Sequence, residues 1–324
     1  AGVQALAQSI GSLDIWSAEA VREALTPAVA LPVVRQAMID LSAGRVRQLL
    51  RSFIGLGEGR TFAIMPAALE QPAVFGAKLV SVFHDGTGRK AHEGLVVLFD
   101  GESGAPVCLA DAGGVTAIRT AAASAAATAA LALPEARVLT ILGGGRQAQE
   151  HVRALSHVRD FADIRVWSRQ GAQSRALADS LAAATGLPVR AAEEARDAVA
   201  DAQVICTVTA AADPILFGEW VAPGTHVNLV GSSGPAQAEA DTDLVARSRY
   251  IVDHREHVLA HGGEFLRARQ AGRIDEAHIA AEIGQVFSGA VPGRAHPDEV
   301  TLYKSLGHAV QDLACVAWLN GRAR

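Results

Sequence analysis

The segment 138–155, VLTILGGGRQAQEHVRAL, constrains the fold of this chain more than any other part of the sequence. An apolar run that suits a buried strand is followed directly by Gly143-x-Gly145-x-x-Ala148 and then by a helical pattern. In a dinucleotide-binding turn the first glycine permits the tight turn, the second lets the backbone approach a pyrophosphate, and the small third residue lets helix and strand pack closely. The helix N-terminus offers unpaired N–H groups and a partial positive charge to the phosphates. The segment therefore predicts a strand–turn–helix unit that binds a nucleotide.

The patterns on either side of that turn predict two domains, for which 324 residues are sufficient. From 137 to 252, strand and helix patterns alternate, which is typical of a doubly wound parallel sheet. The N-terminal part instead predicts two helices and then short strands separated by Gly-rich turns, an α+β domain around an antiparallel sheet. An Ala-rich helix over 115–133 is expected to connect the domains, and the segment 300–319 is predicted to be a helix that returns to the first one. The expected domains are 1–115 with 300–324, and 116–299.

Composition and charge exclude several classes of protein. The net charge is -5 and no block of Lys or Arg stands out, which argues against a nucleic-acid partner. No apolar stretch reaches the ~18 residues needed to cross a bilayer, and the first ten residues lack the pattern of a signal peptide. Three widely spaced cysteines fit a reducing compartment. We expect a cytoplasmic protein that acts on a small molecule and has no membrane partner.

The residues after the second strand of the nucleotide domain indicate which coenzyme binds. That strand ends in Val166-Trp167, and Ser168 and Arg169 follow. Folds that prefer NAD commonly carry an Asp or Glu there to hold the ribose 2′-hydroxyl. A serine followed by an arginine suits a 2′-phosphate, so the sequence favours NADP(H) over NAD(H). The alternative interpretation of Arg169 is a solvated charge at a strand end.

Three cations lie near the ends of apolar segments. Lys78 interrupts the apolar stretch VFGAKLV. A buried amine there needs a partner, and desolvation lowers its pKa toward values useful in acid–base catalysis. The alternative is an edge-strand lysine that points outward. Arg119 carries the only charge on the Ala-rich helix, which suits either a bound anion or a salt bridge between helices. Arg51 is the third cation.

Two other patterns do not carry a function. His254, His257 and His261 share one helical face, but no Cys lies nearby and the H-E-x-x-H arrangement of a zinc site is absent. We therefore expect no metal site. The segment 231–234, GSSG, lacks the G-x-S-x-G spacing of a hydrolase nucleophile turn.

Four segments together resemble the ornithine cyclodeaminase/mu-crystallin family: RTAAASAAAT, ILGGGRQAQEH, DPILFGEWVAPGTHVNLVGSSGP and VTLYKSLGHAVQDL. They occur in the family's order and spread from Arg51 to Asp312. The resemblance implies a homodimer with a substrate-binding and dimerisation domain at the N-terminus and a Rossmann-type domain that binds NAD(H) or NADP(H). Members of the family include ornithine cyclodeaminases, some alanine dehydrogenases and reductases of α-imino acids.

Carried over by motif, the resemblance assigns roles to individual residues. Arg51, Lys78 and Arg119 hold the substrate carboxylate, with Lys78 also placed to exchange a proton at the substrate nitrogen. Leu306 helps to close the substrate pocket. The implied cofactor-binding residues are His92, Arg119, Gly143, Gly145, Arg146, Gln147, Ser168, Arg169, Thr209, Val230, Gly231, Ser232 and Ser305.

One departure from the family pattern separates the possible reactions. Ornithine cyclodeaminases carry an acidic residue in the loop after the Asn-x-x-Gly strand, where this chain has Ser233. A hydroxyl is a poor proton acceptor near neutral pH, and cyclodeamination needs one. Reduction of a preformed imine requires less, and ketimine reductases of the mu-crystallin type resemble this chain in having serine there. We therefore expect a reductase of small α-imino acids, with Lys78 and Ser233 as the candidate catalytic residues.

Two alternatives remain from the sequence. One is an ornithine cyclodeaminase in which Glu239 or Asp241 replaces the missing acid. The other is a non-catalytic protein that keeps the nucleotide pocket but only binds a small ligand.

Overall fold

A computed structural model describes residues 13–84 and 90–322 of the chain. The chain divides into two compact units. Unit 1 consists of the residues up to 119 and those from 308 onward, and unit 2 consists of residues 120–307. The sequence placed these boundaries at 115/116 and 299/300. The second boundary differs because residues 301–304 form a strand of unit 2.

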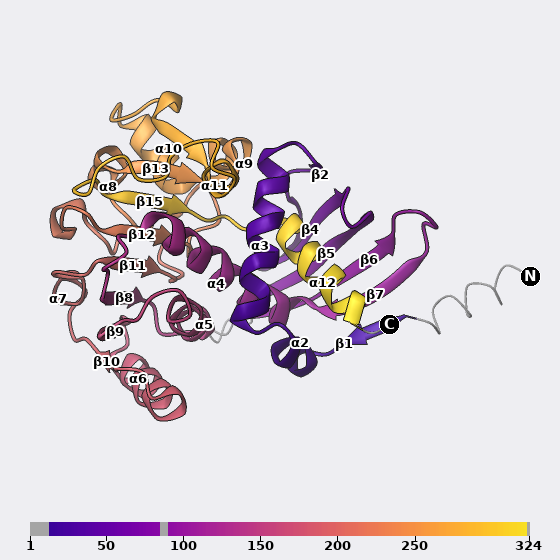
Figure 1. Ribbon diagram of the computed structural model, residues 1–324, viewed down its shortest axis with the longest axis horizontal. Coiled ribbons are helices and arrows are strands. Elements are labelled where there is room, and N and C mark those ends of the chain that lie inside the picture. Colours follow the sequence, from indigo (N-terminus) through magenta and orange to yellow (C-terminus); the bar gives the residue numbers. More distant parts are fainter. Residues whose placement is uncertain (1–12, 85–89, 323–324) are drawn as a thin grey trace, which may run out of the picture. The chain divides into compact units, whose positions relative to one another are not determined.

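Unit 1 is built on a seven-stranded sheet of order β1-β7-β6-β5-β4-β2, in which β3 also pairs with β4. Neighbouring strands are antiparallel except for the parallel pair β1–β7. The strands are β1 (Asp14–Trp16), β2 (Val46–Gln48), β3 (Ser52–Gly57), β4 (Arg60–Leu69), β5 (Val74–His84), β6 (Lys90–Asp100) and β7 (Pro106–Asp111). The helices are α2 (Ala18–Ala24), α3 (Pro27–Ser42) and α12 (Ala309–Arg322), together with the start of α4 (Ala112–Leu131). Figure 1 shows α3 and α12 side by side, with α12 lying across β4 to β7.

One face of this sheet is buried under α12, whereas the other face is only half buried. In β4 the buried side chains of Ala63, Met65, Ala67 and Leu69 alternate with half-buried ones. Directly paired residues of antiparallel strands project to the same face, so Lys78 of β5 shares the buried face with its partner Met65. Lys78 is only 4% exposed, and the alternative of an outward-pointing lysine is therefore wrong.

Unit 2 contains an eight-stranded sheet whose neighbouring strands are all parallel, in the order β10-β9-β8-β11-β12-β15-β13-β14. The order β10-β9-β8-β11-β12 is the 3-2-1-4-5 arrangement of a Rossmann-type fold, so the expected fold class is confirmed (Figure 1). The strands are β8 (Val138–Leu142), β9 (Asp163–Trp167), β10 (Val189–Ala191), β11 (Val204–Thr207), β12 (His226–Leu229), β13 (Arg249–Val252), β14 (Ile279–Glu282) and β15 (Thr301–Lys304). The helices are α5 (Arg146–Leu155), α6 (Gly171–Thr185), α7 (Ala195–Val199), α8 (Thr242–Arg247), α9 (Arg255–His261), α10 (Gly263–Gln270) and α11 (Ile283–Phe287), with 3-10 turns η1 (Gly218–Trp220) and η2 (Glu276–His278).

The predicted helix over 300–319 is wrong in its first part. β15 lies between β12 and β13 in the middle of the sheet, and all four of its residues are buried. The helix α12 begins only at Ala309. A strand this short has no periodicity of its own, so its sequence cannot be distinguished from the first turn of the helix that follows.

In the described part of the chain no single helix is both long and apolar enough to cross a membrane. The helices α2 and α3 meet that test only as a pair, which is bent by 90°.

Candidate nucleotide and substrate sites

The turn between β8 and α5 has the geometry that its glycine motif predicts. Gly143 adopts a φ of +142°, which L side chains rarely adopt. A Cβ at this position would lie 2.7 Å from Val208 Cγ2 and 2.9 Å from the Val208 carbonyl oxygen. The turn therefore requires glycine both for its backbone conformation and for its close approach to the chain after β11.

The N-terminus of α5 fits a pyrophosphate. Gly145 is the N-cap, no side chain caps the helix, and a Cβ at Gly145 would meet nothing within 4 Å. Arg146 is exposed, and Gln147 Oε1 is buried and has no hydrogen-bond partner among the residues that the structure describes. Uncapped N–H groups that face open space are the groups that bind phosphate oxygens at such turns.

Ser168 and Arg169 lie directly after β9, beside the glycine turn. Ser168 is buried and its Oγ donates a hydrogen bond to the Gln170 carbonyl at 2.7 Å. A Cβ at Gly144 would come within 3.0 Å of Ser168 Cβ. Arg169 is exposed and forms no ion pair with the residues that the structure describes. Its guanidinium is therefore available to an anion at the position where these folds hold the adenosine ribose.

A single buried carboxylate, that of Glu239, ties together the loops after β11 and β12. Glu239 Oε1 accepts hydrogen bonds from the backbone N–H and the hydroxyl of Thr209, at 2.6 and 2.7 Å. Its Oε2 accepts from the Thr207 hydroxyl and the Gly231 N–H, both at 2.7 Å. Burial raises the pKa of the Glu239 carboxyl above its ordinary value, and the hydrogen bonds counter that rise. These contacts fix Thr209 and the Val230-Gly231 backbone at the carboxyl ends of β11 and β12.

A second buried network holds Ser232. Lys304 Nζ forms a 3.0 Å ion pair with Glu264 Oε2 and donates hydrogen bonds to the carbonyl and the hydroxyl oxygen of Ser232, at 2.7 and 2.8 Å. Glu264 Oε1 accepts from the Ser232 hydroxyl at 2.6 Å and from the Glu239 N–H at 2.9 Å. Burial acts to raise the pKa of Glu264, but the Lys304 ammonium and these donors hold it below its ordinary value. The two networks therefore share one link and fix both loops.

Ser305 and Leu306 follow β15. The Ser305 hydroxyl is buried, and its Oγ has no hydrogen-bond partner within the described ranges. Leu306 is buried in unit 2, where its N–H donates to Asp253 Oδ2 at 2.6 Å. The predicted cofactor residues of unit 2 thus lie in the turns or loops that follow β8, β9, β11, β12 and β15, or, for Arg146 and Gln147, in the first turn of α5. Parallel folds of this class bind nucleotides at this end of the strands.

The two carboxylates that the cyclodeaminase alternative offers, Glu239 and Asp241, both have hydrogen-bond partners. Ser233 is exposed in the loop after β12. The Glu239 carboxylate accepts the hydrogen bonds from Thr207, Thr209 and Gly231 described above. Asp241 Oδ1 accepts from the N–H groups of Leu244 and Gly218, both at 2.9 Å, and so caps α8. Both carboxylates therefore serve the local fold.

Unit 1 brings Lys78 and Arg119 together on one carboxylate that the sequence interpretation missed, Asp312 of α12. Asp312 is fully buried; its Oδ2 lies 3.0 Å from Lys78 Nζ and its Oδ1 accepts from Arg119 Nε at 3.0 Å. Lys78 also donates to Thr116 Oγ1 at 3.3 Å. Burial, partly offset by Asp312, lowers the pKa of Lys78 to about 8. We call Lys78, Arg119, Asp312 and Arg51 the cationic cradle.

Arg51 belongs to the cradle through its charge, and Gln311 lies beside it. Arg51 is close enough for its charge to lower the Lys78 pKa further. Gln311 Oε1 accepts from Arg119 Nη1 at 3.0 Å and from the His308 N–H at 3.1 Å. Within the described residues, Arg119 Nη2 has no acceptor. Lys78, Arg119 and the half-buried Arg51 thus lie around one carboxylate, and cations gathered in this way suit a carboxylate ligand.

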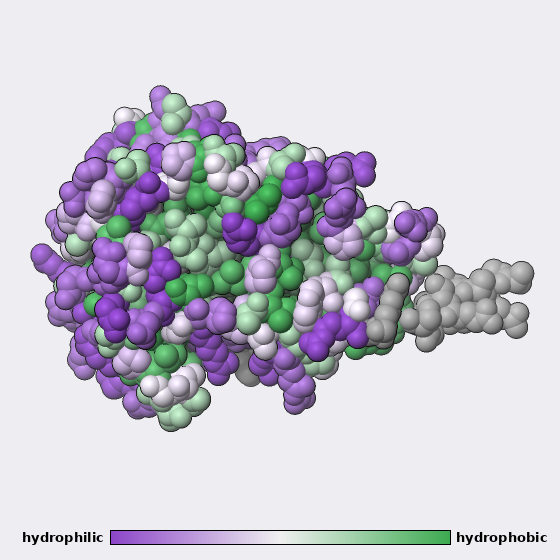
Figure 2. Space-filling view, viewed as in Figure 1, coloured by the Kyte–Doolittle hydropathy of each residue, from purple (hydrophilic) through white to green (hydrophobic). Residues whose placement is uncertain are grey.

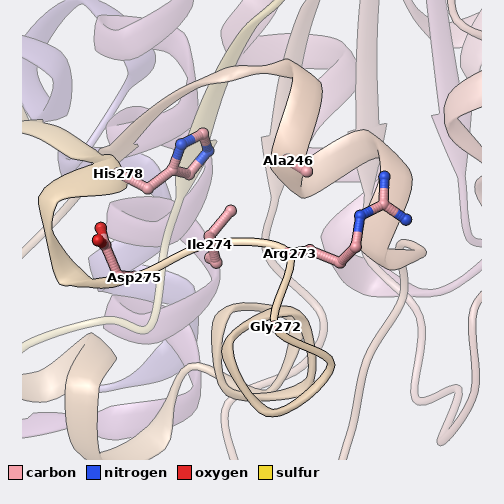
Figure 3. A pocket seen from close by; sticks show the side chains of 6 residues that line it. All are labelled: Ala246, Gly272, Arg273, Ile274, Asp275 and His278. Carbon is pink, nitrogen blue, oxygen red and sulfur yellow. The ribbon is translucent and has the colours of Figure 1, made fainter.

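The remaining predictions have less structural support. His92 lies in β6, where it pairs with Val82, but its side chain is outside the described part of the structure. The described residues contain no group of three or more His, Cys, Asp or Glu side chains that could hold a metal ion. An open pocket of about 500 Å³ lies on unit 2 (Figure 3), but none of the predicted site residues lines it. Its lining residues are Ala246, Gly272, Arg273, Ile274, Asp275 and His278.

Sequence comparisons agree with this geometry. The chain is 37% identical to ketimine reductase mu-crystallin of Mus musculus over 318 residues, which covers 94% of this chain and 97% of that protein. It is 32% identical to a Δ(1)-pyrroline-2-carboxylate reductase of Bacillus cereus over 291 residues, 89% of each chain. These relatives support an NAD(P)-dependent oxidoreductase.

Solved structures and family models identify the family. The Δ(1)-pyrroline-2-carboxylate reductase of Thermococcus litoralis, in complex with NADH and L-proline, superposes with a TM-score of 0.91 at 30% identity and covers 96% of this chain and 97% of that one. The model of the ornithine cyclodeaminase/mu-crystallin family matches residues 13–324. The resemblance drawn from the sequence motifs is therefore confirmed, and the chain belongs to the ornithine cyclodeaminase/mu-crystallin family.

Proposed function

We propose that this protein reduces small cyclic α-imino acids, of the pyrroline-2-carboxylate or piperideine-2-carboxylate type, to the corresponding amino acids with NADPH. The observation that carries the proposal is the cationic cradle, in which a buried amine lies beside two guanidinium groups. The similarity to two imino acid reductases over most of the chain supports the same reaction class.

Each residue of the cradle has a chemical task in this reaction. Arg119, through its unpaired Nη2, and Arg51 bind the substrate carboxylate and so orient the C=N bond. When bound, the reduced nicotinamide supplies the hydride that attacks the imine carbon. Protonated Lys78 donates a proton to the imine nitrogen. The C=N bond thus receives one hydride and one proton and becomes the CH–NH group of the amino acid. Orientation of the reacting atoms at about 3–3.5 Å accounts for much of the expected acceleration.

The preference for NADPH rests on Ser168 and the unpaired Arg169. A 2′-phosphate would receive charge-assisted hydrogen bonds there, whereas a 2′-hydroxyl meets no carboxylate. Arg169→Ala is therefore expected to weaken NADPH binding about 10- to 100-fold and NADH binding little. Isothermal titration with both coenzymes measures this, and equal losses for the two would refute the preference.

The reductase is favoured over the cyclodeaminase because Ser233 lies where the acid is needed and because Glu239 and Asp241 are occupied. The experiment is a spectrophotometric assay of NADPH oxidation with Δ1-pyrroline-2-carboxylate, together with ammonia release from L-ornithine and NAD⁺. We expect proline from the imine and no ammonia from ornithine. Ammonia from ornithine would establish the cyclodeaminase, and coenzyme binding without turnover of any cyclic imine would indicate a ligand-binding protein.

The proposal includes a homodimer formed through the half-buried face of the sheet in unit 1. Figure 2 shows the face that carries α3 and α12, on which hydrophobic and hydrophilic side chains are interspersed. On the opposite face Phe75 stacks on Phe99 at 5.1 Å, and Phe75, Phe83 and Leu95 are 38–48% exposed. An apolar sheet face of this extent is typical of an interface. Light scattering of the wild type is expected to give twice the mass of the chain. The Leu95→Glu variant is expected to have a measured mass closer to that of a single chain. A monomeric wild type would contradict the dimer.

A further inference from the structure

Asp312 is the only carboxylate among the described residues that contacts Lys78 or Arg119. It approaches them from α12, whereas Lys78 lies on β5 and Arg119 lies on α4. One fully buried group therefore joins three elements of unit 1. Burial acts to raise the pKa of Asp312. The pKa nevertheless stays below its ordinary value because of the interactions with the two cations.

The groups that face the Lys78 amine are few. On α12 the facing group is Asp312. Cys315, one turn later, is near Asp312 and Arg119, and its thiol stays protonated because burial and the Asp312 charge raise its pKa to about 12. On α4 the facing groups are Arg119 and the neutral Thr116 hydroxyl. Arg51 faces the amine from the segment between β2 and β3. Among the described residues, the other charged neighbours of Lys78 are Arg119 and Arg51, and both disfavour a protonated lysine.

We propose that Asp312 is the positioning residue of the cradle, which keeps the Lys78 amine protonated and aims Arg119 at the substrate carboxylate. This inference rests on the proposed imine reduction, because only a protonated Lys78 donates to the imine nitrogen. Asp312 itself does not touch the substrate. It takes part through Lys78 and Arg119, and its charge allows these two cations to be buried together.

The variant Asp312→Asn separates these tasks. An asparagine oxygen can still accept from Arg119 Nε, but the other atom becomes an N–H₂ group that opposes the Lys78 ammonium. Loss of an opposite charge at this distance is expected to lower the Lys78 pKa by about 1–3 units. The matched control is Thr116→Val, which removes a neutral acceptor of Lys78 without changing the charge and is expected to leave the titration within about half a unit.

The titration can be observed without any catalysis, because the chain contains only three lysines, Lys78, Lys90 and Lys304. NMR of protein labelled with ¹³C at lysine Cε, assigned with Lys78→Arg and Lys90→Arg, follows the three groups separately. The expected result is that the Lys78 signal of the Asp312→Asn variant titrates at lower pH than that of the wild type, while Lys90 is unchanged. An unshifted Lys78 signal would overturn the proposal.

The kinetic readout tests the same inference in the reaction. The alkaline limb of kcat/KM for Δ1-pyrroline-2-carboxylate is expected to move to lower pH in Asp312→Asn, and kcat to fall more than KM rises. A merely structural defect would lower the rate equally at every pH. If Asp312→Asn does not fold, Asp312→Glu is the second variant, because it keeps the negative charge. It is expected to lose turnover, while the alkaline limb of its kcat/KM profile stays at the wild-type pH. A shift of that limb would contradict the proposal. Absence of imine reduction in the wild type would refute the proposed function and leave the NMR titration as an independent test of Asp312.

Discussion

The two units each bury a lysine against a carboxylate at 3.0 Å, yet the two pairs differ in their surroundings. Lys304 in unit 2 faces Glu264 and also donates two short hydrogen bonds to Ser232. Lys78 in unit 1 faces Asp312 and has one longer hydrogen bond, to Thr116 at 3.3 Å. The first ammonium has three partners and no competing cation, whereas the second shares its carboxylate with Arg119.

This difference separates a structural lysine from a chemical one. A buried ammonium that has three close partners holds the loops it contacts rigidly. A buried ammonium with too few partners and an excess of positive charge around it can exchange a proton and bind an anion. The same residue type therefore supports the loops of the nucleotide site in unit 2 and supplies the acid in unit 1.

The largest expected effect is on turnover. Lys78→Met removes the proton donor, so kcat for imine reduction should fall about 10²- to 10⁴-fold, the range typical of general acid catalysis. NADPH affinity should stay within about twofold, because Lys78 is not among the residues assigned to the coenzyme, most of which lie in unit 2. Steady-state assays and coenzyme titration measure both. Turnover of Lys78→Met equal to that of the wild type would remove Lys78 from the mechanism.

The second effect is on stability, where the loss of Lys304 should matter more than the loss of Lys78. Lys304→Met leaves the Glu264 carboxylate buried and unpaired, which typically costs about 3–5 kcal/mol. Lys78→Met leaves Asp312 paired with Arg119, so its cost should be clearly smaller. Urea unfolding of the two variants measures the difference. Equal losses of unfolding free energy would contradict the assignment of the two lysines.

The third effect concerns the pH dependence of stability. The pKa of Lys78 in the folded protein is lowered to about 8, mainly by burial, and its ordinary value is 10.5. Between these values the unfolded chain binds more protons, so the free energy of unfolding should rise with pH, by up to about 3 kcal/mol from this group. Lys78→Met should lack this contribution. Unfolding of both proteins at pH 7.5 and pH 10.5 tests it, and parallel pH profiles would exclude a lowered Lys78 pKa.

The smallest effect is expected at Glu239. In Glu239→Gln the carboxamide N–H₂ would oppose one of the backbone donors, Thr209 or Gly231, that the carboxylate now accepts. An unsatisfied backbone donor typically costs about 1–3 kcal/mol. We expect weaker coenzyme binding with Lys78 chemistry intact, so the alkaline limb of the pH profile should not move. A moved limb would show that Glu239 takes part in proton transfer.

The sequence predicted the parts of this molecule that depend on local patterns. Gly143 and Gly145 follow from backbone geometry at a strand–helix turn, and the alternation of strands and helices specified the parallel sheet of unit 2. Lys78 was identified because a charge in an apolar strand is unusual. The same argument applied to Lys304 in TLYKSL would have drawn attention to its buried pair.

Other features depended on contacts between distant segments. Asp312 lies 234 positions after Lys78 in the chain, and nothing local to α12 distinguishes it from a solvent-exposed helical acid. Glu239 is one of two candidate acids in the cyclodeaminase alternative because the sequence does not reveal that Thr207, Thr209 and Gly231 already donate to it. β15 was missed because a central strand of four residues depends on its neighbours in the sheet for its conformation.

The most direct measurement is the pH dependence of NADPH oxidation by the wild-type protein with Δ1-pyrroline-2-carboxylate. If a protonated, buried Lys78 supplies the proton, the rate should be high near neutral pH and should decline as the pH rises through about 8. The decline should be absent from the residual activity of Lys78→Met. A wild-type rate that stays constant or increases up to pH 10 would contradict the central role of the cradle.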